Sequence, residues 1–242
     1  MKKHVVTAAS VLAGLSMMSG TAFAQTGSVG ANFARVETDL GDGEAYGIDG
    51  ESIYETGGGW SAIVSADLTD SDGGDAVVSL EGHLINRGSN NAWGGFVGLA
   101  DGDGGTVVSV GAEYAQFFDT STLAFNANWG TDDDNNVDAY GVNGAYRIFA
   151  SDNLRFDIGG SLGRAETAGF EFDVNTLGVG VEYRFDASPF SVGAAYTRVD
   201  SDLGEADVIG VTARWNFGDT TLKAADRSGA TFTDLGSALQ SF

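Results

Sequence analysis

Ser79, Glu81 and His83 come nearest, in residue type and spacing, to a catalytic group in this chain. A serine nucleophile, an imidazole base and an orienting carboxylate are the parts of a hydrolase. The three alternate along one segment, and same-face residues of a strand stand roughly 6.6 Å apart, beyond hydrogen-bonding reach for the short serine. Apart from His4, His83 is the one histidine of the sequence. We therefore interpret His83 as a polar wall residue, and we expect neither catalysis nor a cofactor.

Two acidic segments present oxygens of the kind that calcium and magnesium bind. They are residues 70–75, with the sequence DSDGGD, and residues 132–134, with the sequence DDD. Neither has the spaced glutamate of an EF-hand loop. We expect solvated turns whose charges repel one another, and no specific metal site; loose bridging of divalent cations to a neighbouring surface is the alternative.

An alternation of apolar residues with period two indicates which elements position these side chains. Clear examples are residues 60–68, 123–129 and 154–162. Many such segments of roughly 9 to 11 residues are typical of transmembrane β-strands. An acidic β-solenoid also favours Gly and Asp, but its nine-residue repeat is absent. We predict an all-β, antiparallel up-and-down transmembrane barrel with about twelve strands, at 28–37, 45–54, 60–68, 76–86, 92–100, 106–118, 122–130, 137–149, 154–163, 171–185, 190–199 and 207–217.

Each predicted strand has one apolar face and one polar or small face. Over 76–86, Leu80 and Leu84 are assigned outward, and Glu81 and His83 inward. A charge facing the middle of the bilayer is costly, so the apolar face must meet lipid. Because most inward residues are small, twelve strands should enclose a narrow water-filled lumen.

The inward charges form two groups. The predicted basic arc consists of Arg147, Arg155, Arg184 and Arg214, and the predicted acidic arc of Asp49, Glu51, Glu81 and Glu113, together with His83. Arcs that face each other would create a transverse field across a constriction, which orients dipolar solutes and admits small ions of either sign. In the alternative, Asp157 and Glu182 neutralise the arginines in a wall network, and the two interpretations are not exclusive.

The first 24 residues have the pattern of a secretory signal peptide. Lys2 and Lys3 precede an apolar run over 5–18, and Ala-Phe-Ala at 22–24 precedes Gln25. The run is too short for a spanning helix. The chain has no cysteine, which rules out disulfides and thiolate metal sites. A formal net charge of −22 argues against binding nucleic acid through phosphate contacts.

The connections between predicted strands alternate between short and longer ones. The longer set, near 38–44, 69–75, 101–105, 131–136, 164–170 and 200–206, carries most of the acidic residues. In outer-membrane barrels the periplasmic turns are short and the outer loops long. Both termini should therefore face the periplasm, and the outer rim should be strongly negative.

The last predicted strand, 209–217, has the sequence IGVTARWNF, with Gly210 followed by alternating apolar residues up to Trp215 and Phe217. It resembles the assembly signal of the Gram-negative outer-membrane porin family, and the resemblance covers residues 25–217. It implies a cleaved signal peptide (1–24), a barrel (25–217) placed in the outer membrane by the assembly machinery, and contact with outer-membrane lipid and lipopolysaccharide. The family's signal commonly ends the chain, whereas 25 residues follow here. We expect 218–242 to be a periplasmic tail, with a short helix folded back toward the lumen as the alternative.

These features together predict a porin for passive diffusion of small hydrophilic solutes or ions, not an enzyme. The alternative is a structural or surface-interaction barrel with a closed lumen, whose acidic loops bind cations or lipopolysaccharide. Porins are often trimers, so a homo-oligomer is compatible with the sequence.

Overall fold

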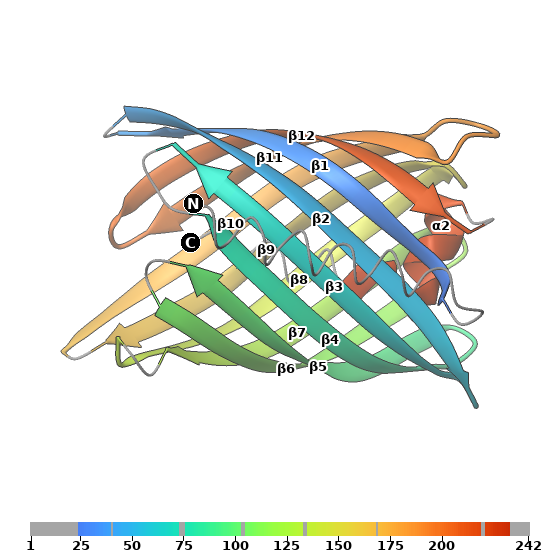
Figure 1. The fold of residues 1–242 in the computed structure, drawn as a ribbon, viewed down its shortest axis with the longest axis horizontal. Helices are drawn as coiled ribbons and strands as arrows, with labels where there is room; N and C mark the ends of the chain where they lie inside the picture. The colour runs from blue at the N-terminus through green and yellow to red at the C-terminus, as the bar shows by residue number, and fades with distance from the viewer. Residues whose placement is uncertain are drawn as a thin grey trace.

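The chain folds into a closed barrel of twelve antiparallel strands, followed by a short helical segment (Figure 1). This computed structural model describes residues 24–39, 41–72, 76–102, 105–132, 135–167, 169–218 and 221–232. The elements are β1 (Ala24–Thr38), β2 (Gly41–Gly57), β3 (Trp60–Ser71), β4 (Val77–Arg87), β5 (Asn91–Gly102), β6 (Gly105–Phe117), β7 (Ser121–Asp132), β8 (Val137–Ser151), β9 (Leu154–Thr167), β10 (Phe170–Arg184), β11 (Phe190–Ser201), β12 (Gly204–Phe217), α2 (Leu222–Ala225) and η1 (Asp226–Ala230).

Each strand pairs with its neighbours in sequence, and β12 pairs with β1 to close the barrel. The closing register runs from Gly27 opposite Phe217 to Thr38 opposite Ala206. Closure leaves no unpaired sheet edge, as a structure that spans a membrane requires. The predicted fold class and the twelve predicted strands are confirmed. Below, the end of the barrel at which β1 begins and β12 ends is called the terminal end, and the opposite end the distal end.

The strands are longer than predicted at the distal end. Pairing continues to Thr38 opposite Gly41 and to Ser201 opposite Gly204. Most of the acidic connections predicted as longer loops are therefore paired hairpin ends. Cross-strand ion pairs link these ends, and they include Arg35–Asp42 at 2.6 Å and Arg164–Asp173 at 2.7 Å. Asp75, Asp133 and Asp134 of the acidic segments lie outside the described residues.

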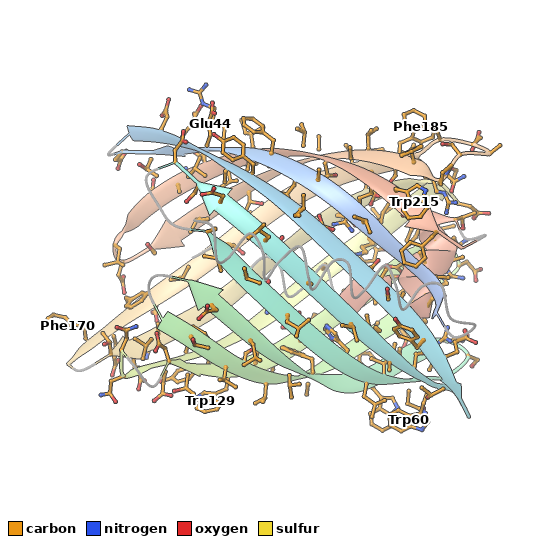
Figure 2. All side chains as sticks on the ribbon, viewed as in Figure 1. Glu44, Trp60, Trp129, Phe170, Phe185 and Trp215 are labelled. Carbon is orange, nitrogen blue, oxygen red and sulfur yellow. The ribbon has the colours of Figure 1, made fainter. Side chains whose placement is uncertain are left out.

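The two faces of the strands have the predicted polarity. On β4, Leu80 and Leu84 are 39% and 52% exposed on the outer face, whereas Ser79, Glu81 and His83 are buried inside the barrel. Aromatic side chains lie near both ends, with Trp60, Phe185 and Trp215 at the terminal end and Trp129 and Phe170 toward the distal end (Figure 2). An apolar outer band between aromatic girdles is the surface that a bilayer requires.

The predicted assembly signal forms β12. Trp215 is exposed on the outer face, while Gly210 faces the lumen beside Ala34. The Phe217 ring lies over β1, so close that a Cβ added at Gly27 would stand 2.2 Å from its Cζ. The alternation is thus present, while its recognition by assembly machinery stays a prediction. So does the signal peptide, because residues 1–23 lie outside the described part of the chain.

After β12, residues 221–232 turn back into the terminal end of the barrel (Figure 1). Thr221 begins α2, since its hydroxyl accepts a hydrogen bond from the Ala224 amide at 3.2 Å. Asp226 and Phe232 are buried there. Within the described residues, neither helical element is long and apolar enough to cross a membrane. This segment is part of the region expected as a periplasmic tail; the compartment that it faces stays a prediction, and residues 233–242 lie outside the described residues.

Candidate channel lumen

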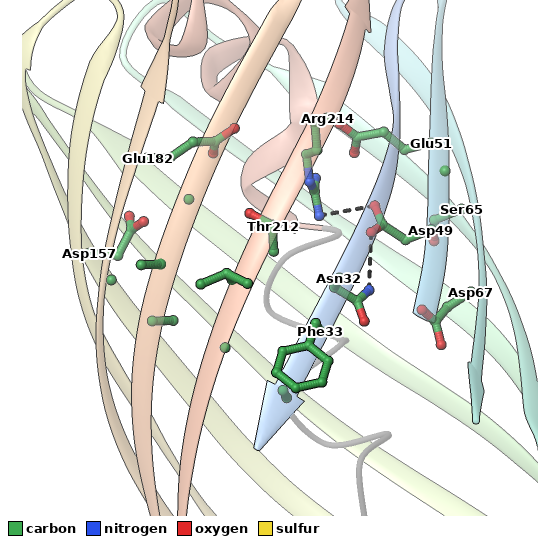
Figure 3. Close-up of a pocket in the computed structure, with 18 of the residues that line it drawn as sticks. Asn32, Phe33, Asp49, Glu51, Ser65, Asp67, Asp157, Glu182, Thr212 and Arg214 are labelled. Atoms are coloured by element: carbon green, nitrogen blue, oxygen red, sulfur yellow. Dashed lines mark hydrogen bonds and ion pairs between the residues drawn. The ribbon is translucent and has the colours of Figure 1, made fainter. Parts of the chain in front are cut away.

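A cavity of about 430 Å³ lies inside the barrel (Figure 3). Strands β10–β12 line it mainly with small residues, for example Gly180, Ala195 and Thr212, because these strands alternate large outward with small inward side chains. Its charged lining residues are Asp49, Glu51, Asp67, Glu81, Arg155, Asp157, Glu182 and Arg214. Six carboxylates against two guanidinium groups make the cavity formally acidic.

Arg214 contacts the acidic group directly. Its Nη2 lies 3.0 Å from Oδ2 of Asp49, and the Asn32 amide donates to Oδ1 of the same carboxylate at 3.4 Å (Figure 3). Barrel closure places β1 between β12 and β2, so these two strands are near neighbours. For Arg214, the expectation that the basic arc faces the acidic arc across the lumen is wrong, because Arg214 and Asp49 share one side of the wall.

Arg155 forms a compact network with two acids that also border the cavity. Its Nε lies 2.9 Å from Oδ2 of Asp157, and its Nη2 lies 3.1 Å from Oε2 of Glu182. The Ser191 hydroxyl donates to Oε1 of Glu182 at 2.7 Å. For this arginine the structure has the wall network that the sequence offered as an alternative.

The other two predicted basic residues lie away from the cavity. Arg147 is buried, with its Nη1 2.7 Å from Oδ1 of Asp226 and its Nε 3.6 Å from Oδ1 of Asp157. Arg184 donates from Nε to the Ser188 carbonyl at 3.1 Å, within the turn that joins β10 to β11. The predicted basic arc therefore divides into three parts. Arg155 and Arg214 border the cavity, Arg147 contacts the C-terminal segment, and Arg184 lies at a turn.

His83 lies between two carboxylates. Its Nδ1 is 3.1 Å from Oε2 of Glu113, and its Nε2 is 3.5 Å from Oε2 of Glu81. Its ring also packs against Phe96, with centroids 5.5 Å apart. The structure thus brings Glu81, His83 and Glu113 together in one buried cluster, and His83 faces acids from β4 and β6 instead of the hydroxyl of Ser79.

Sequence reasoning missed three inward isoleucines and the residues that cover them. Ile53, Ile63 and Ile85 are almost fully buried at the terminal end, in one cluster with Ala230 and Phe232. The signal was present in the alternation, because these isoleucines occupy inward positions of β2, β3 and β4. Apolar residues facing inward are out of place in a water-filled lumen.

No family model matches the sequence, and no curated protein matches it. Solved structures do match. The COG4313 outer membrane channel from Pseudomonas putida F1 aligns with a TM-score of 0.59 at 13% identity, covering 81% of this chain and 97% of that one. The NanC porin aligns with a TM-score of 0.59 at 8% identity, covering 77% and 98%. The KdgM porin in complex with disordered oligogalacturonate aligns with a TM-score of 0.56 at 10% identity, covering 78% and 99%.

The chain has the fold of the small outer-membrane channels. Identities this low show the fold alone. The matches also include the translocator domain of the autotransporter NalP from Neisseria meningitidis.

Proposed function

We propose that this protein is a passive outer-membrane channel for small hydrophilic solutes, and that it prefers cations to anions. The observation that carries the proposal is the lumen cavity of about 430 Å³, whose charged lining has six carboxylates and two arginines. Carboxylates that line a pore favour cations, because they replace part of the hydration that a cation loses on entry.

Ion pairs inside the wall leave the net acidity of the cavity lining unchanged, because each one joins opposite charges. Arg214 is held by Asp49, and Arg155 by Asp157 and Glu182, so both positive charges are offset where they stand. The remaining acid excess sets the sign of the potential. Clefts lined by one sign of charge raise the local concentration of counter-ions, and an acidic distal rim would add to this effect.

The occupant of one similar structure differs in charge from the solute that we propose. The KdgM porin was solved with oligogalacturonate, which is a chain of carboxylated sugars. An acidic lumen repels such a polyanion. We therefore expect this channel to pass cations and neutral solutes in preference to acidic oligosaccharides.

Reversal potentials in a planar bilayer under a salt gradient test the proposal. The full chain should form channels with a cation-to-anion permeability ratio above one. Replacing Glu51 and Asp67 together with Gln and Asn should move that ratio toward one, because it removes two lining charges while keeping side-chain shape. The matched control is Asp186→Asn, which removes an exposed charge in the turn after β10 and should leave the ratio unchanged. Anion-preferring channels from the unmodified protein would refute the proposal.

A barrel with a closed lumen is the second candidate, and the C-terminal segment inside the terminal end favours it. In that case the acidic distal rim would act on the outer surface, binding cations or lipopolysaccharide. Well-folded protein that forms no channels in the bilayer, with or without the C-terminal segment, would establish this candidate over the channel.

A further inference from the structure

Three isoleucines on the lumen wall form an apolar seat for the C-terminal segment. Ile53, Ile63 and Ile85 belong to three adjacent strands, and their exposed fractions are 1% or less. Ala230 and Phe232 bury them, and Phe232 is itself only 1% exposed. The interior of an outer-membrane pore is otherwise polar, so the segment that covers these isoleucines explains why an apolar patch lies there.

The fit between segment and seat is close. A Cβ added at Gly229 would lie 2.6 Å from Cδ1 of Ile63 and 3.3 Å from Cδ1 of Ile85. Gly229 also has a backbone φ of 140°, a value that residues other than glycine rarely adopt. A glycine at this position therefore lets the backbone rest directly on the isoleucines.

Polar contacts hold the same segment at two places. Near the terminal ends of β7 and β8, the fully buried Asp226 accepts hydrogen bonds from Arg147 and from the Thr122 hydroxyl, both at 2.7 Å. At the barrel mouth, Arg227 donates to the carbonyls of Phe118 and Asp119. Two strand residues and two residues of the β6–β7 turn thus fix the position of the segment.

We propose that residues 221–232 are a built-in plug, which narrows the terminal mouth of the channel and is latched by the Asp226–Arg147 pair. This inference rests on the proposed channel function. If the segment left its seat, Asp226 and Arg147 would return to water, where each charge is well solvated, and the three isoleucines would become exposed. The plugged and open states would therefore differ in lumen width and in access to the segment's backbone.

Removing the segment tests its effect on conduction. A chain ending at Gly218 keeps all twelve strands, and its folding can be checked by heat-modifiable gel mobility. A helix with its side chains is about 10 Å across, so its removal should raise the single-channel conductance by roughly twofold or more. A folded, truncated barrel with the conductance of the full chain would overturn the plug and leave the channel standing. Channels from neither protein would refute the channel, and the plug's role with it.

A milder variant tests the latch without removing the segment, and it decides the matter if the truncated chain does not fold. Asp226→Asn keeps the shape of the side chain and removes its charge. Trypsin cleavage after Arg227, followed by mass spectrometry on the protein in detergent micelles, reports how often the segment leaves its seat. Cleavage should become about 10- to 100-fold faster, the change that corresponds to losing one charged hydrogen bond.

The matched control removes a contact of the same segment outside the latch. Lys223→Gln removes the ion pair with Asp152, whose closest atoms are 3.7 Å apart and whose carboxylate is exposed. Exposed pairs contribute little, so cleavage after Arg227 should stay within about twofold of the unmodified rate. Equal cleavage rates for Asp226→Asn and Lys223→Gln, with unchanged conductance, would overturn the latch.

Discussion

Arginine substitutions on the outer surface distinguish a barrel in a bilayer from a barrel in water. Val97 lies at the middle of β5, opposite Gly82 and Val110, and it is 61% exposed. Leu203 lies in the turn between β11 and β12 and is 78% exposed. In water, both positions would accept an arginine at little cost. In a bilayer, Val97→Arg places a charge in hydrocarbon, whereas Leu203→Arg places it beyond the membrane.

The expected difference is large enough to measure. An arginine at the midplane of a barrel costs about 2–4 kcal/mol, and near the interface about 0–1 kcal/mol. At 1.4 kcal/mol for each factor of ten, Val97→Arg should shift the folding equilibrium by roughly 30- to 700-fold. Urea titration of folding into lipid vesicles, read by heat-modifiable mobility, measures both variants. Equal midpoints for Val97→Arg and Leu203→Arg would mean that the middle of β5 does not face lipid.

Three further predictions concern closure, plug and lumen. Gly27→Ala should destabilise the barrel by about 1–3 kcal/mol, because its Cβ would meet the Glu51 carbonyl at 2.3 Å and the Phe217 ring at 2.2 Å. The control, Gly82→Ala, has open space around its Cβ. It should stabilise the barrel by about 0.4–1 kcal/mol in the same urea titration. Phe232→Ala should weaken plug docking by up to about 3–5 kcal/mol, seen as faster tryptic cleavage after Arg227. The cation preference of the channel should fall between 0.1 M and 1 M salt, because the screening length shortens from about 10 Å to about 3 Å; reversal potentials measure it.

The alternation of side chains was sufficient to predict the barrel and its two faces. On β4 the assignment of Leu80 outward and Glu81 inward is correct because a one-residue slip would place a carboxylate in lipid. The distal strand ends were not predictable in this way. Beyond the membrane both faces meet water, so the pairing of Thr38 with Gly41 leaves no apolar pattern in the sequence.

The candidate site was predictable in its residues but not in its contacts. Inward parity predicted Arg155 and Arg214 on the inner wall, and both side chains border the cavity. The partner of Arg214 depends on closure between the first and last strands, a relation that linear spacing does not display. Asp226, the nearer of two acidic partners of Arg147, is 79 residues away in a segment that lacks strand periodicity, so only the folded chain brings the two together.

On three strands, the lumen wall changes from polar to apolar between one inward-facing residue and the next. This change places the cavity and the plug at different depths. Glu51 is followed by Ile53 on β2, His83 by Ile85 on β4, and Ser65 is preceded by Ile63 on β3. The plug therefore lies at the exit of the cavity and does not fill it.

The charged Asp226–Arg147 latch also indicates a plug that can leave the cavity exit. Burying two charges is a poor means of stabilisation, because well-packed apolar residues of similar volume do as well or better. Apolar residues in place of both Asp226 and Arg147 would hold the segment at least as firmly, whereas replacing Asp226 alone would leave Arg147 buried without this partner. A charged pair, whose members are both well solvated once they separate, lowers the cost of leaving the seat and so favours a plug that can be released.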